Sequence, residues 1–269
     1  MPSVSVKRST PARQRRESVR PVAASKVDDH QHKTTPDDQA AISASDQWQH
    51  KASEKFPWWQ DWRGECVAII AGGESAKTIN LDLLRDRIHV IAINESFKLC
   101  PWADVLYACE ATWWNMRQND TAKFAGLKIG FEVPMLAIKQ TVHRITIKKD
   151  KSNIHDPWIH EFLFDEPGEI GSGQNGGFQA INLAAQFGAT GIALVGFDMQ
   201  ILKKVHWHGN HPSPLRNPDR DRLVVWREKL DAKAPALAQR GIDVVCCSPS
   251  ALRAFPQMTI EQMLERWGL

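Results

Sequence analysis

The most constraining feature of this chain is a series of short, almost wholly apolar runs, each followed by a polar or glycine-rich turn. Such runs are typical of strands buried on both faces, as in a parallel sheet covered by helices. Segments with helical spacing that end at a glycine, 178–187 and 221–240, separate the later runs. The clearest runs are Cys66–Ala71, His89–Ile93, Asp104–Ala108, Gly191–Gly196 and Ile242–Cys247.

This alternation predicts a single α/β domain at 63–269, with a doubly wound, mainly parallel, Rossmann-like sheet. Residues 1–47 hold few large apolar side chains and no sustained periodicity, which predicts a disordered, polar and basic tail. The segment 48–62 is rich in tryptophan and is expected to dock on the domain or on a partner. Weaker patterns predict further strands at 126–130 and 144–147 and a short helix at 75–85.

Composition limits the functional classes. The net charge of +3 is too small to indicate a nucleic-acid-binding domain, although basic residues dominate before Val27 and leave contact between the tail and nucleic acid open. Five cysteines without a C-x-x-C pair argue against a disulfide framework and a structural zinc site, and favour a reducing compartment. No run is long enough to span a bilayer, and the first residues lack the apolar core of a secretory signal. We therefore expect a cytoplasmic protein without a membrane span.

In open α/β sheets a ligand binds outside the carboxyl ends of the strands, so the loops that follow the strands are the candidate site. After the first strand, Gly72 and Gly73 permit close approach of the backbone, and Ser75 would cap a helix or bind phosphate. Asn94 ends the second strand and suits a base or a ribose. Glu110 ends the third and would act as an acid, a base or a ribose partner. The alternatives are a plain tight turn at Gly72 and Gly73, a local turn role for Asn94 and a salt bridge for Glu110.

A second glycine-rich loop, Gly171–Gly177, precedes the helix predicted at 178–187. So many glycines at a helix start favour a loop that wraps a ligand over a flexible linker. Ser172 and Gly173 are its candidate contacts.

The densest polar signal is the triplet His206, His208 and His211, which follows Asp198 at the end of a predicted strand. Two interpretations compete. Neutral imidazoles would bind a metal, perhaps together with Asp198, or one histidine would act as a general base while the others contact phosphate or sugar. A histidine-rich surface loop is the third possibility. Neither H-E-x-x-H nor G-x-S-x-G occurs, which argues against a zinc protease and a serine hydrolase.

Taken in order, these motifs resemble a known family. The chain is similar to the bacterial sialyltransferases of glycosyltransferase family 42, and most of all to phage-encoded members. The Maf-type and MptE-like proteins share the same Rossmann-like core. The resemblance covers roughly 64–255 and is carried by Gly72-Gly73-Glu74-Ser75, Asn94, Ser172-Gly173 with Gly176-Gly177, Gly196-Phe197-Asp198-Met199 and Cys247-Ser248-Pro249-Ser250-Ala251-Leu252.

The resemblance implies a glycosyltransferase-like enzyme that transfers a sugar from a nucleotide-activated donor. It places Gly72, Gly73, Ser75 and Asn94 on the nucleotide, and it places Ser172 and Gly173 on the donor. One histidine of the triplet would be the general base, with Asp198 orienting the loop. A phage-encoded member would work in the host cytoplasm.

On this interpretation no residue is assigned to a metal, although a divalent metal is left open. One alternative is diphosphate transfer of the MptE-like kind, with Mg²⁺ held by Glu110 and Asp198. The other is a nucleotide-sensing or DNA-associated binding module without turnover, whose basic tail would contact nucleic acid. The sugar, the acceptor and the oligomeric state do not follow from the sequence.

Overall fold

The computed structural model describes residues 47–133 and 140–269. Its contacts divide the chain into Met1–Ala41 and Ile42–Leu269, and only the second unit contains described residues. The disordered tail expected at 1–47 therefore lies almost wholly outside the described residues. Within the described part, no helix is long and apolar enough to cross a membrane.

The second unit is built on a seven-stranded sheet in the order β5-β4-β3-β2-β1-β8-β9, and every neighbouring pair is parallel. This arrangement confirms the predicted doubly wound α/β fold. The predicted buried runs all form strands in this sheet. The strands are β1 (Cys66–Ile70), β2 (His89–Ile93), β3 (Val105–Ala108), β4 (Leu127–Gly130), β5 (His143–Arg144), β8 (Gly191–Val195) and β9 (Asp243–Cys246).

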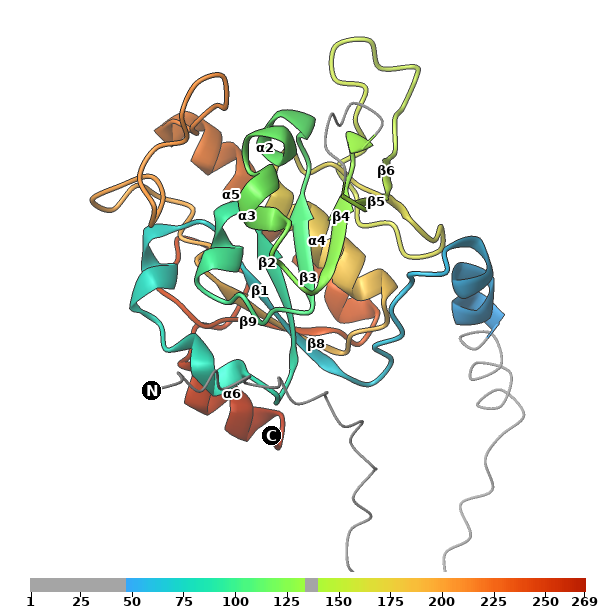
Figure 1. Cartoon of the computed structure of the whole chain (residues 1–269). Helices are drawn as coiled ribbons and strands as arrows, with labels where there is room; N and C mark the ends of the chain where they lie inside the picture. The colour runs from blue at the N-terminus through green and yellow to red at the C-terminus, as the bar shows by residue number, and fades with distance from the viewer. Residues whose placement is uncertain (1–46, 134–139) are drawn as a thin grey trace, which may run out of the picture. The chain divides into compact units, whose positions relative to one another are not determined.

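Helices cover both faces of the sheet (Figure 1). Alternate strand residues point to opposite sides: Val67 and Ile69 pack into the core shared with α4 and α5, whereas Ala68 and Ile70 pack into the core shared with α6. Both cores are fully apolar at the strands, as the continuous runs in the sequence require. The helices are α2 (Ala111–Met116), α3 (Gln118–Thr121), α4 (Gly176–Gln186), α5 (Arg220–Gln239) and α6 (Ile260–Arg266).

Two weaker predictions differ from the structure. The helix expected at 75–85 is instead a pair of 3-10 turns, η1 (Glu74–Thr78) and η2 (Leu81–Leu84), because Ile79 is extended and the Asn80 side chain caps the second turn. The strand expected at 144–147 is divided between two sheets. Its first part ends β5, and its second is β6 (Thr146–Ile147), which pairs with β7 (Glu169–Ile170) in a separate two-stranded sheet.

The tryptophan-rich segment packs on its own domain. Residues 47–55 are helical, and Trp59 and Trp62 are buried. Both indoles meet Phe187 edge-on with ring centroids 4.9 Å apart, and Trp62 also stacks on His89 at 4.5 Å. These contacts bury apolar area against the end of α4. Of the two roles expected for this segment, docking on its own domain is therefore the one that the structure shows.

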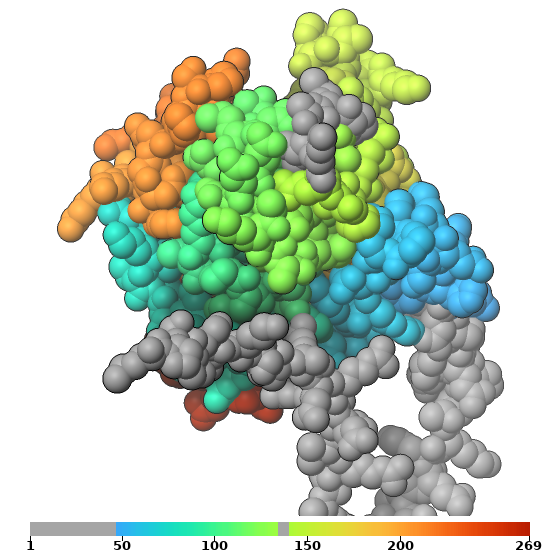
Figure 2. All heavy atoms as spheres, viewed as in Figure 1, coloured from blue at the N-terminus to red at the C-terminus, as the bar shows by residue number. Residues whose placement is uncertain are grey.

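The sheet reverses its winding direction between β1 and β8. From β1 the chain proceeds to β2 on one side, and it returns to β8 on the other side of β1. At such a reversal the loops after the two strands diverge and leave a crevice at the carboxyl ends. Figure 1 shows the long orange segment after β8 at the same end of the sheet as α2, and Figure 2 shows it against the blue-green and green residues that follow β1 and β2. The candidate site lies at this reversal.

Candidate functional site

A pocket of about 570 Å³ opens at the carboxyl ends of β1, β2, β3 and β8. Most of the loops that the sequence singled out contribute to its wall. The predicted site residues that line it are Gly72, Gly73, Asn94, Glu110, Asp198, His206 and His211. Ser75, Ser172, Gly173 and His208 do not line it.

Asp198 fastens the loop after β1 to the loop after β8. Its carboxylate accepts hydrogen bonds from the backbone N–H of Ser75 at 3.0 Å and from the Ser75 hydroxyl. A Cβ at Gly73 would stand only 2.5 Å from Asp198 Oδ1 and 2.4 Å from the Gly196 carbonyl oxygen, so only glycine permits this approach. Burial raises the pKa of Asp198, and the bonds from Ser75 oppose that rise.

The hydrogen bonds between Ser75 and Asp198 give these two residues roles that differ from those expected from the sequence. Both donors of Ser75 are directed at Asp198, so Ser75 holds the loop rather than facing the pocket. Asp198 acts on the loop that carries Gly72 and Gly73, where the sequence interpretation had it orient the histidine loop. It therefore fixes the floor of the pocket.

The histidine loop is tied to the same floor by other contacts. The Trp207 backbone N–H donates to the Gly72 carbonyl at 3.1 Å. The Glu74 carboxylate accepts from the backbone N–H groups of Lys203 and Lys204 at 2.7 and 2.9 Å. These bonds lower the pKa of Glu74. The loop thus has a defined position over the β1 loop.

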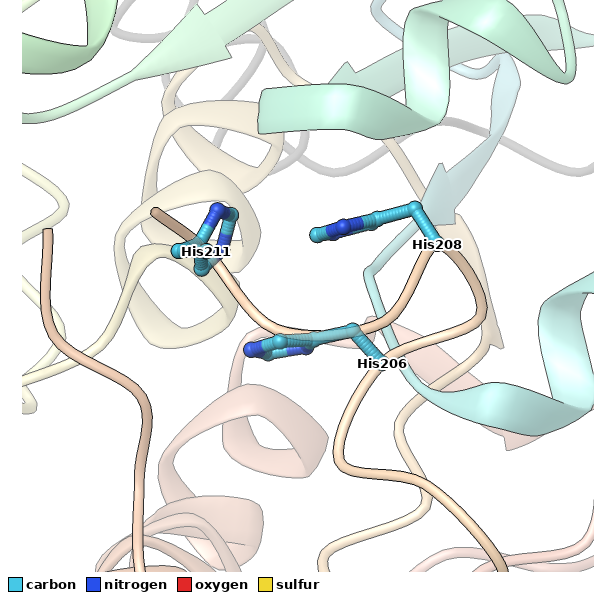
Figure 3. Close-up of side chains that lie close together, drawn as sticks. All are labelled: His206, His208 and His211. Carbon is cyan, nitrogen blue, oxygen red and sulfur yellow. The ribbon is translucent and has the colours of Figure 1, made fainter. Parts of the chain in front are cut away.

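His206, His208 and His211 converge on one point (Figure 3). The rings of His206 and His208 are nearly parallel with centroids 5.1 Å apart, and His211 lies 4.8 and 4.7 Å from them. One ring nitrogen of each lies within 4.8 Å of the other two. Among the described residues, this is the only group of three histidine, cysteine or acidic side chains close enough to hold a metal ion. Glu110 and Asp198, the expected Mg²⁺ ligands, belong to no such group.

Burial decides the charge of these rings. It lowers the pKa of His206 and of His208 to about 4, and repulsion from the neighbouring imidazoles adds to the effect. Burial also lowers the pKa of His211. All three rings are therefore uncharged at neutral pH and present lone pairs. A general base works best when its pKa is near the working pH, so a pKa of about 4 weakens the base interpretation and suits metal ligation.

Glu95 is a buried carboxylate whose charge acts on His208 and His211, and it is bound by three donors. Lys98 Nζ lies 2.7 Å from it, Arg117 Nε donates to it, and Trp113 Nε1 donates at 3.3 Å. Burial acts to raise the pKa of Glu95, but the bonds from Lys98 and Arg117 outweigh it and the net pKa is lowered. Its charge still acts on the triplet, because it opposes the fall in the pKa of His208 and of His211.

The opposite wall of the pocket carries positive charge. Arg216 and Arg222 line it, and within 47–133 and 140–269 neither guanidinium forms an ion pair with an acid. The N-terminus of α4 lines it as well, with the N-cap Asn175 followed by Gly176 and Gly177. At the start of α5 the Asp219 carboxylate caps the helix by accepting from the Arg222 backbone N–H, so this helix end presents an acid to the pocket. Helix N-termini offer free N–H groups and a partial positive charge to anions. The part of the pocket formed by Arg216, Arg222 and the α4 N-terminus therefore suits an anionic group, whereas Glu110, Asp198 and Asp219 line the rest.

The other predicted residues have mixed outcomes. Asn94 lines the pocket with φ of 49°, a left-handed conformation that asparagine tolerates better than most residues. Burial raises the pKa of Glu110, and the neighbouring Glu132 charge raises it further. Ser172 and Gly173 lie behind the wall, because the Ser172 hydroxyl accepts from the Gln174 backbone N–H and a Cβ at Gly173 would collide with Phe178 at 2.1 Å. Their successors in the loop, from Gln174 onward, line the pocket instead.

Sequence reasoning missed several lining residues. Trp226 reaches the pocket from α5, and its indole Nε1 is buried without a hydrogen-bond partner. Arg216 and Arg222 flank the start of the same helix. The only available signal was their place after a strand end, since isolated arginines and a helical tryptophan carry no motif.

The fold and the pocket define a doubly wound α/β protein with an anion-compatible site at the reversal point of its sheet. No protein-family model matches the chain, and no curated protein matches its sequence. Similar solved structures do exist.

A structure of the sialyltransferase CstII from Campylobacter jejuni with the substrate analogue cytidine-5'-monophosphate is 13 % identical, over 73 % of this chain and 86 % of that chain, with a TM-score of 0.44. A point mutant of the α-2,3/8-sialyltransferase CstII is 14 % identical over 72 % and 87 %, with a TM-score of 0.45. CST-II with a trisaccharide acceptor and CMP is 13 % identical over 72 % and 86 %, with a TM-score of 0.42. At these values the likeness assigns no residue role and no activity to this chain.

Proposed function

We propose that the pocket binds a nucleotide-activated donor and that the protein is a glycosyltransferase-like enzyme that transfers a sugar from it. The observation that carries the proposal is the convergence of Arg216, Arg222 and the N-terminus of α4 on one pocket at the reversal point of the sheet. These groups complement phosphate oxygens.

The pocket also has room and partners for the rest of a nucleotide. Its volume of about 570 Å³ lies within the range of small-molecule sites. The backbone of Gly72 and Gly73 lines the pocket, and the Asn94 amide offers both a donor and an acceptor. The Trp226 indole gives an aromatic wall with an unused N–H, a surface on which a base would stack.

The transferred group is inferred from the motif order that resembles family 42. In the proposed complex, Gly72, Gly73 and Asn94 hold the nucleotide, while Gln174–Gly177 take the donor role first expected of Ser172 and Gly173. Ser75 and Asp198 fix the loop from behind. The histidine triplet faces the pocket through His206 and His211, where an acceptor hydroxyl would be activated.

A thermal-shift screen tests this proposal with nucleoside mono- and diphosphates, CMP among them, and with nucleotide sugars. At 100 times its Kd, a ligand that binds only the folded state stabilises it by about 2.7 kcal/mol. For a domain of about 200 residues this raises the Tm by roughly 5–10 °C. We expect one nucleotide class to give this dose-dependent shift. A flat response to the whole panel would contradict the proposal.

A further inference from the structure

We propose that His206, His208 and His211 form a binding site for one divalent transition metal ion of the Zn²⁺ class, with an open coordination position toward the pocket. Binding of the ion is independent of the proposed function, and only the role of the open position rests on it.

The spacing of the ring nitrogens fits such an ion. Tetrahedral ligands with bonds of about 2.0–2.1 Å lie about 3.3 Å from one another. The three candidate nitrogens lie within 4.8 Å of each other, so each must move inward by about 0.8 Å at most. Small rotations of the three rings supply that movement. Imidazole nitrogens suit Zn²⁺ and its neighbours, whereas Mg²⁺ and Ca²⁺ require oxygen ligands.

The hydrogen bonding of His206 leaves the required nitrogen free. Its Nδ1 is the ring atom nearest Gly72, 3.1 Å from where a Cβ there would stand, and the ring is hydrogen-bonded to the Gly72 backbone. With Nδ1 donating to the carbonyl, the lone pair lies on Nε2, which is buried and has no partner. A histidine that ligates a metal through one nitrogen and binds a backbone carbonyl through the other shows the same arrangement.

His211 gives a second, independent sign. Its Nδ1 is also buried without a hydrogen-bond partner. Buried polar atoms are nearly always satisfied, so two orphaned nitrogens in one cluster of three rings indicate an absent ligand common to both. Glu95, whose charge acts on His208 and His211, does not take that place, because Lys98 and Arg117 bind it.

The orientation of the site gives the ion a functional position. A site with three protein ligands leaves the fourth position to water or to substrate. His206 and His211 line the pocket and His208 does not, so we infer that the open position faces the volume assigned to the ligand. There the ion would bind an oxygen of the pocket's ligand and lower the pKa of a bound hydroxyl or water.

Titration of the chelator-stripped full chain with Zn²⁺ alone, followed by the visible spectrum of the Co²⁺ form, tests the inference. We expect one equivalent of Zn²⁺ to bind and Co²⁺ to show nitrogen-ligated tetrahedral absorption. The variants H208Q and H211Q should each weaken binding by more than about 100-fold, above the cost of losing an outer partner. The control H143Q, a histidine outside the triplet, should bind as the wild type does.

Equal Zn²⁺ affinity in the wild type and both triplet variants, with their melting curves intact, would overturn the inference. If H211Q melts early, H208Q decides, because the His208 ring is partly exposed and does not line the pocket. Nucleotide binding measured in chelator separates the two proposals. Zn²⁺ binding without nucleotide binding removes the proposed function alone, and the reverse result removes the metal site alone.

Discussion

Acid should destabilise this fold through the partly buried histidines His206 and His208. Burial holds the pKa of His206 and of His208 at about 4, whereas an imidazole in an unfolded chain titrates near 6.5. Between these values the unfolded state binds more protons than the native state. The free energy of unfolding therefore falls as the pH is lowered from about 6.5 to about 4, and it is unaffected by these rings above that window.

The size of the effect follows from the same values. A fall of about 2.5 in pKa corresponds to about 3.5 kcal/mol for a fully buried ring, at about 1.4 kcal/mol for each step of one in pKa. Both rings keep some contact with solvent, which screens part of this interaction, so about 1.5 kcal/mol each is expected. Together they account for about 3 kcal/mol of stability lost between pH 6.5 and 4.

Urea unfolding at a series of pH values, in chelator, measures this quantity. The double variant H206Q/H208Q cannot take up these protons. Between pH 6.5 and 4 its free energy of unfolding should therefore fall by about 3 kcal/mol less than that of the wild type. Carboxylates such as Asp198, whose pKa is raised by burial, contribute equally to both proteins and cancel in the difference. Parallel curves of stability against pH for the wild type and the variant would show that these two histidines do not cause the loss of stability in acid.

Three further outcomes are expected. Gly73→Ala should lower the free energy of unfolding by about 1–3 kcal/mol, because its Cβ would meet the Gly196 carbonyl oxygen. Gly72→Ala should cost less, because its Cβ meets only the His206 ring, at 3.1 Å; equal losses in urea unfolding would argue against the close packing of Gly73 on Gly196 and Asp198. Trp226→Leu should weaken nucleotide binding by about 1–3 kcal/mol in calorimetry if the base stacks on the indole, and unchanged affinity would place the base elsewhere. Asn94→Ala should weaken nucleotide binding by a similar amount, and unchanged affinity would limit the role of Asn94 to its backbone conformation at positive φ.

The sheet was predictable because both of its faces are covered. A strand buried on two sides must be apolar at every position, and the run at Cys66–Ala71 therefore reveals both the strand and the parallel sheet. The same principle places the loops after the strands at one edge, which is why Asn94 and Asp198 were found. Short elements were less predictable: at 75–85 a local cap by Asn80 divides the segment in two.

The roles within the site were harder to derive, since they depend on contacts between distant segments. Ser75 has the sequence context of a phosphate ligand, yet Asp198, 123 residues away, takes both of its donors. Arg216 and Arg222 belong to no sequence motif, and only the structure places them in one pocket with the α4 N-terminus. The histidine triplet was conspicuous, but only its burial and its unpartnered nitrogens favour a ligand role over a base.

Calorimetric titration with the nucleotide that gives the largest thermal shift tests the central claim most directly. We expect one site per chain, and we expect the variant R216Q/R222Q to weaken binding by at least about 10-fold, which corresponds to the loss of one charged hydrogen bond. The control R253Q removes an exposed arginine outside the pocket and should bind as the wild type does. Equal affinity in R216Q/R222Q and in the wild type, with both folded, would contradict a nucleotide bound in this pocket.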